Sequence, residues 1–199
     1  MIRAGLPAEA HRNSGEWVFI DLGFAKSAKS CGLLVGDGIP TEISFSQLRA
    51  EVTAIALSNQ TPLNLLIEAP LSVAFTATGN PTGRSFERRG KQTRYWYVGL
   101  GCSVLVAATY LLRAVYDLHP GREIRLFEGL ASFKPKGVRS SHSRDVIGLR
   151  RVIWEDASCS GSVIPAEELP AAQGDRVFSA FLVAGMDFGV PPVVVLGGP

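Results

Sequence analysis

The chain is poor in cysteine and carries almost no net charge. Its three cysteines lie far apart, without a CxxC or Cys/His pattern, so we expect neither a disulfide framework nor a zinc site and interpret them as reduced thiols. The 20 basic and 18 acidic residues leave a formal net charge of +2. No global basic field therefore indicates a polyanionic partner, and any nucleic-acid surface would have to be local.

The beginning of the chain lacks an apolar segment of signal-peptide length. Residues 1–15 instead contain charged side chains, among them Arg3, Glu9 and Arg12. We interpret residues 1–15 as a flexible N-terminal tail and expect a cytoplasmic protein. The hydrophobic fraction of 46% and the mean hydropathy of +0.18 predict a packed core. We find no internal repeat, so we expect a single domain over residues 16–199.

Residues 95–112 form an uncharged run of 18 residues between Arg94 and Arg113. This length is at the lower limit for a membrane-spanning helix, but a helix buried against a sheet would have the same composition. We favour the buried helix of a soluble protein, because one central span would divide an otherwise continuous α/β pattern. We therefore expect no membrane partner.

The pattern of apolar residues predicts an α/β protein. The expected strands are residues 16–22, 31–36, 41–45 and 63–68, a strand ending at Glu128, and residues 193–196. The expected helices are residues 47–57 with Ser46 as N-cap, 95–112, 143–154 and 175–188. Short turn-forming segments separate the first three strands, which predicts an antiparallel meander. The fourth strand is mostly aliphatic, so we place it near the centre of the sheet.

Three apolar runs each end in a carboxylate, at Asp21, Glu68 and Glu128. If the runs are neighbouring parallel strands, the acids leave the sheet at its carboxyl edge, where open α/β sheets bind ligands. Adjacent strands lie about 4.8 Å apart, so acids at their ends can share a divalent cation. Asp175 opens the last expected helix, where an N-terminal cap is an alternative role. We identify Asp21, Glu68 and Asp175 as candidate metal ligands.

Short motifs in the chain resemble a known group of proteins. The segment IDLGFAKSAKSCGLLV, from Ile20 to Val35, is similar to the opening hairpin of RuvC-type junction resolvases. Glu68 in LLIEAP stands where that group carries a Glu on its fourth strand, and Asp175 in GDRVFSAFLVA stands where it carries an Asp at the start of its last helix. The order of the elements, with the strand RLFEG, is also similar to an uncharacterised family of predicted ribonuclease H-like nucleases.

The resemblance implies a ribonuclease H-like fold, with an antiparallel three-strand meander, parallel strands and helices on both faces of a mixed sheet. It also implies a metal-dependent nuclease that uses Mg²⁺ or Mn²⁺, with Asp21 bridging two ions and Glu68 and Asp175 holding one each. The last helix shows one acid where resolvases usually present two. Glu128 is therefore a further candidate catalytic residue, at or beside the metal.

A basic loop follows the strand that ends at Glu68. Its five cations are Arg84, Arg88, Arg89, Lys91 and Arg94. They alternate with aromatic residues, and arginine forks with aromatic faces are suited to phosphates and unstacked bases. We identify the five cations as candidate substrate contacts for a nucleic acid, with a solvated loop as the alternative. In a serine-rich segment further along the chain, His142 has no recognisable partner, and we interpret it as a surface histidine.

Two other classes of function remain open. One is a binding module that has the ribonuclease H-like fold but no catalytic activity. The other is a nucleotide-binding protein similar to actin-like ATPases and sugar kinases, because Asp21 and Gly23, followed by Lys26 and Lys29, look like their first phosphate loop. Those enzymes use two such domains, whereas this chain has the length of one.

Overall fold

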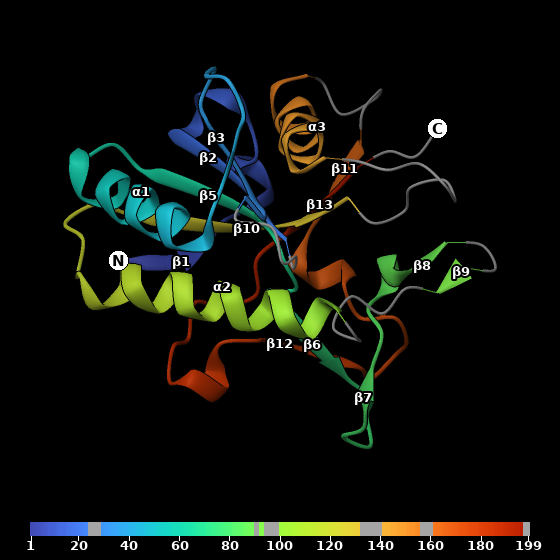
Figure 1. Ribbon diagram of the computed structural model, residues 1–199. Coiled ribbons are helices and arrows are strands. Elements are labelled where there is room, and N and C mark those ends of the chain that lie inside the picture. The colour runs from blue at the N-terminus through green and yellow to red at the C-terminus, as the bar shows by residue number, and fades with distance from the viewer. Residues whose placement is uncertain (24–28, 90–91, 94–99, 132–140, 156–160, 197–199) are drawn as a thin grey trace.

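The computed structural model describes residues 1–23, 29–89, 92–93, 100–131, 141–155 and 161–196, which form an α/β domain around a mixed sheet (Figure 1). Within these residues the sheet has eight strands in the order β11-β13-β10-β5-β2-β3-β4, with β1 also paired to β10. Its strands are β1 (Ile2–Ala4), β2 (Glu16–Leu22), β3 (Cys31–Val35), β4 (Thr41–Ile43), β5 (Leu63–Glu68), β10 (Ile124–Leu130), β11 (Gly161–Ile164) and β13 (Val193–Leu196). The helices are α1 (Phe45–Ser58), α2 (Leu100–Asp117) and α3 (His142–Trp154).

The centre of the sheet has the predicted mixed character. Strands β2, β3 and β4 form an antiparallel meander, whereas β2, β5 and β10 run parallel to one another. Strand β5 is buried along its whole length, which agrees with its aliphatic sequence. The sequence prediction of a mixed sheet with a three-strand meander and parallel strands is confirmed.

Helices cover both faces of the sheet, with α1 and α2 on one side and α3 on the other (Figure 1). Side chains alternate along β2, because successive residues of a strand point to opposite faces. Val18 and Ile20 belong to the core under α1 and α2, whereas Trp17 and Phe19 pack in the core under α3. The predicted helix layers are therefore confirmed.

Helix α1 begins at Phe45, two residues earlier than the sequence predicts. Its N-cap is Ser44 and not Ser46: the Ser44 hydroxyl accepts a hydrogen bond from the backbone of Gln47, and the Gln47 side chain accepts one from the backbone of Ser44. This capping box satisfies two backbone donors at the helix start. Phe45 therefore belongs to the helix, and β4 ends at Ile43.

Helix α2 begins at Leu100, and residues 95–99 of the expected helix lie outside the described residues. It runs to Asp117, five residues beyond the expected end, and buries Val104, Ala108, Leu111 and Val115 against the sheet and α1. Among the residues that the structure describes, no helix is long and apolar enough to cross a membrane.

The N-terminal segment is placed differently from the expected tail, because β1 joins the main sheet. It pairs in parallel with the first half of β10, and β13 pairs with the second half. Arg3 fixes the segment through ion pairs with Glu9 at 2.5 Å and Glu123 at 2.7 Å. Two of the charges that suggested a solvated tail, Arg3 and Glu9, therefore pair with each other, and Arg3 also pairs with Glu123 on a distant part of the chain.

The expected helix over residues 175–188 is wrong. Residues Arg176–Ser179 form β12, which pairs antiparallel with β6 (Ser72–Phe75) in a small second sheet with β7 (Pro81–Thr82). A single 3-10 turn follows, and it ends at Gly185 with a φ of +72°, a conformation that stops a helix. Pairing with a distant strand overrides the local apolar pattern here.

Candidate metal centre

Asp21 and Glu68 lie side by side at the carboxyl ends of two neighbouring parallel strands. They are register partners on β2 and β5. Both occupy positions that face α3, because Phe19 and Leu66, two residues earlier on each strand, pack in the core under that helix. Their exposed fractions are 5% and 6%. The predicted neighbourhood of these two acids is confirmed.

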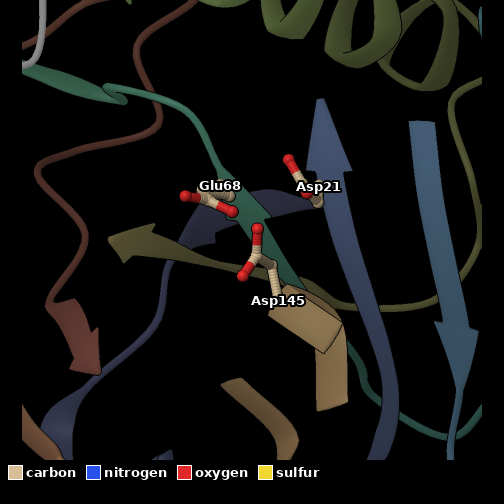
Figure 2. A group of neighbouring side chains, drawn as sticks. All are labelled: Asp21, Glu68 and Asp145. Atoms are coloured by element: carbon tan, nitrogen blue, oxygen red, sulfur yellow. The ribbon is translucent and has the colours of Figure 1, made fainter. Parts of the chain in front are cut away.

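The third acid of the site is Asp145, which the sequence analysis did not single out. It lies in the first turn of α3, whose N-cap Ser141 accepts a hydrogen bond from the backbone of Arg144. One carboxylate oxygen of each residue lies within 4.8 Å of the others (Figure 2). We call Asp21, Glu68 and Asp145 the carboxylate group. Asp145 lies four residues before Leu149, and both side chains are on the buried face of α3. This spacing is the feature of the sequence that could have indicated that Asp145 faces the sheet.

The electrostatics of the carboxylate group favour a cation. At an effective dielectric constant of about 20, two unit charges 4.8 Å apart repel each other by roughly 3 kcal/mol. A cation bound between the three acids would offset this repulsion. Carboxylate oxygens are hard ligands of the kind that divalent cations prefer, so the group can hold a metal ion.

His142 contacts this group, which corrects its interpretation as a surface histidine. Its Nδ1 lies 2.7 Å from Oδ2 of Asp21, and its side chain is 29% exposed. The hydrogen bond to Asp21 raises the pKa of His142 above its ordinary value, although partial burial opposes the rise. Asp21 therefore has a titratable partner within the site.

Two glycines allow His142 to approach the end of β2. A Cβ atom at Gly23 would overlap the carbonyl oxygen of Ser30 and the His142 ring. A Cβ atom at Gly32 would lie 2.8 Å from the carbonyl oxygen of His142. The absence of side chains at these two positions is thus a requirement of the close contact between α3 and the hairpin of β2 and β3.

Glu128 does not belong to the carboxylate group, which corrects its expected role. In the register of β10 its partner on β5 is Ile67, so the residue level with Glu68 is Gly129. Glu128 therefore faces the side of α1 and α2, whereas Gly129 faces Leu66 under α3. A difference of one residue in register places the acid on the opposite face of the sheet.

Asp175 also lies outside the carboxylate group. It occupies the turn before β12, where its Oδ2 accepts a hydrogen bond from the backbone of Ala172 at 3.1 Å. It lines a cavity of about 210 Å³ together with Thr76, Thr82 and Arg84. Its expected place at the start of a helix is replaced by this turn, so the structure gives the third position of the site to Asp145.

The structure corrects one of the five candidate substrate contacts. The Arg84 side chain is fully buried, and its guanidinium is engaged by ion pairs with Glu87 at 3.0 Å and Glu128 at 2.8 Å, so it is not a free phosphate-binding group. Arg88 and Arg89 form the short strand β8, which pairs with β9 (Gln92–Thr93). The other two cations, Lys91 and Arg94, lie outside the described residues.

The chain was compared with protein-family models, with curated proteins and with solved structures. No family model, no curated protein and no solved structure matches it. The geometry of the carboxylate group is therefore the basis for assigning a function.

Proposed function

We propose that the protein is a Mg²⁺- or Mn²⁺-dependent phosphodiesterase that cleaves nucleic acid and has a ribonuclease H-like fold. The observation that carries the proposal is the convergence of Asp21, Glu68 and Asp145 at the carboxyl edge of parallel strands. Open α/β sheets bind ligands at this edge. Buried carboxylates held on two strands and a helix are also a suitable framework for a divalent cation.

The arrangement of the sheet supports the proposed fold. An antiparallel meander lies beside the parallel strands β5 and β10, and helices cover both faces. This is the arrangement that the resemblance to ribonuclease H-like proteins implies. Asp145, on the helix that follows β10, takes the place in the site that the sequence analysis gave to Asp175.

The carboxylate group and His142 have different tasks in this function. Asp21, Glu68 and Asp145 would hold the ion, and Mg²⁺ keeps several water ligands, so three protein carboxylates are sufficient. When bound, the ion supplies the Lewis acidity that phosphodiester hydrolysis requires. His142 orients the Asp21 carboxylate through Oδ2 and holds a proton beside the site.

The basic segment after β7 would contact the substrate. Arg88 and Arg89 on β8, with Lys91 and Arg94, remain candidates for phosphate contacts, because guanidinium and ammonium groups bind phosphate oxygens. Nucleic acid is the substrate class that fits this segment, because it combines phosphodiesters for the cations with bases that can stack on the aromatic residues.

The substitution Asp21→Asn tests the function. It removes a ligand charge and preserves the shape of the side chain, so we expect loss of Mn²⁺ binding in calorimetry and loss of cleavage of DNA, RNA and branched substrates. Asp175→Asn is the matched control, because it makes the same chemical change outside the carboxylate group. We expect the control to bind Mn²⁺ and to cleave like the wild type.

Other results would exclude the proposed activity. Equal cleavage by the wild type and Asp21→Asn would remove the nuclease assignment. Nucleic-acid binding by the wild type, without cleavage at any Mg²⁺ or Mn²⁺ concentration, would instead favour a non-catalytic binding module. Stabilisation by ATP would favour the nucleotide-binding alternative.

A further inference from the structure

Three charged side chains form a cluster that is completely buried. Arg84 Nη1 donates hydrogen bonds to Glu128 Oε2 at 2.8 Å and to Ser72 Oγ at 2.7 Å, and Nη2 donates to Glu87 Oε1 at 3.0 Å. The side chains of Arg84, Glu87 and Glu128 are each 0% exposed. We call these three residues the arginine cluster.

The arginine cluster joins segments that are far apart in the sequence. Glu128 Oε2 also accepts a hydrogen bond from the backbone of Leu71 at 2.8 Å, three residues beyond Glu68. Glu87 Oε2 accepts one from the backbone of Arg84, and Arg88, the next residue after Glu87, begins β8. A single guanidinium thus connects β10, the segment that leaves the acidic end of β5, and the segment that enters β8.

Stability does not explain why these charges are buried together. Arg84 pairs with two carboxylates, and within the described part of the chain Glu128 Oε1 and Arg84 Nε have no hydrogen-bond partner. Apolar residues of similar size often give equal or greater stability at such places. What the charged groups add is direction, because a planar guanidinium fixes its partners at defined angles.

We propose that Arg84 is a positioning residue, which holds β8 with Arg88 and Arg89 in a fixed place relative to the end of β5 that carries Glu68. The proposal rests on the proposed function in one respect, namely that the ligand of β8 is a nucleic acid. Arg84 then determines how well the substrate binds without touching it, and it does not influence the carboxylate group.

The test is a variant that neutralises the whole cluster, Arg84→Met, Glu87→Gln and Glu128→Gln, because it leaves no buried charge without a partner. We expect its melting temperature and its affinity for Mn²⁺ to remain close to those of the wild type. Backbone hydrogen exchange at residues 71–72 and 84–87 should become faster. Binding of a single-stranded oligonucleotide should become weaker, by about tenfold at low salt.

The salt dependence of binding separates positioning from direct contact. The positioning variant keeps all the phosphate-binding cations, so the slope of log K against log[salt] should stay at the wild-type value. The matched control, Arg88→Ala with Arg89→Ala, should reduce that slope by roughly 1.4 and leave hydrogen exchange at residues 84–87 unchanged. Arg84→Lys retains the charge but not the planar fork, so it should show faster exchange and an unchanged slope with a smaller loss of affinity. This variant serves as the test if the triple variant fails to fold.

Unchanged exchange at residues 84–87 in the folded variants would overturn the proposal. A slope reduced by about 0.7 in the triple variant, with unchanged exchange, would overturn it as well, because the cation removed at Arg84 would then have contacted phosphate itself. If the wild type does not bind nucleic acid, the proposed function fails, and the exchange measurement alone decides whether Arg84 positions β8.

Discussion

The carboxylate group lies at the carboxyl ends of β2 and β5, and Glu128 of the arginine cluster lies near the carboxyl end of the neighbouring strand β10, on the opposite face of the sheet. In the arginine cluster, Glu128 is paired with a guanidinium, which remains charged at every physiological pH. In the carboxylate group, Asp21 is paired with the imidazole of His142, which can lose its proton. The difference shows that an acid at a strand end identifies a functional site only together with its face of the sheet and the nature of its cationic partner.

The largest difference expected between the two regions is in their contribution to stability. Arg84→Ala leaves Glu87 and Glu128 buried without their cation, so the free energy of unfolding should fall by about 3–5 kcal/mol in urea denaturation. Arg113→Ala is the control, because Arg113 is 52% exposed in its pair with Asp117 and should contribute about 0–1 kcal/mol. Equal losses in the two variants would show that the arginine cluster is open to water.

A matched pair of variants compares the two regions through metal affinity. Glu68→Gln removes a charged ligand from the carboxylate group, so we expect Mn²⁺ affinity to fall by more than the roughly 10- to 100-fold seen when only the outer partners of metal ligands are altered. Glu128→Gln makes the same change on the other face and should leave the affinity within about twofold. Calorimetric titration of both proteins gives the two values. A similar loss of affinity in both variants would mean that Glu128 acts on the ion after all.

A smaller effect is expected for pH, because the imidazolium of His142 can lose its proton whereas the guanidinium of Arg84 cannot. In the metal-free protein, the hydrogen bond to Asp21 raises the pKa of His142, so the folded state binds the proton more tightly than the unfolded state. This contribution to stability is complete below the unfolded pKa of about 6.5 and disappears as pH rises through the folded value. Melting curves with a chelator should therefore show a fall over this range that is absent in His142→Asn. A parallel pH dependence in both proteins would contradict the contact.

The sequence was sufficient to predict that Asp21 and Glu68 are neighbouring acids, because both lie at the ends of strands whose apolar pattern is unambiguous. Their pairing required only that β2 and β5 be neighbours. Glu128 required the register of β10 as well, and a shift of one residue changes the face. Sequence analysis alone could not give this register, because it is set by contacts along the entire strand.

The remaining differences come from contacts between distant parts of the chain. The first turn of α3 reaches the sheet through packing of the helix, so the role of Asp145 depends on tertiary structure. Pairing with β6 makes β12 a strand, against the helical expectation for that segment. Arg84 lies in a basic loop whose composition predicts a substrate contact or a solvated surface, and its burial depends on the distant partner Glu128.

The edge of β10 has a consequence for how the chain folds during synthesis. Strand β11 pairs with β13, which is made about 30 residues later on the ribosome, so β11 cannot join the sheet when it first emerges. Until β13 arrives, the second half of β10 also presents unpaired backbone groups on an apolar strand. Such an edge is open to pairing with other chains. Pairing with β13 therefore protects this edge of β10 against association with other chains.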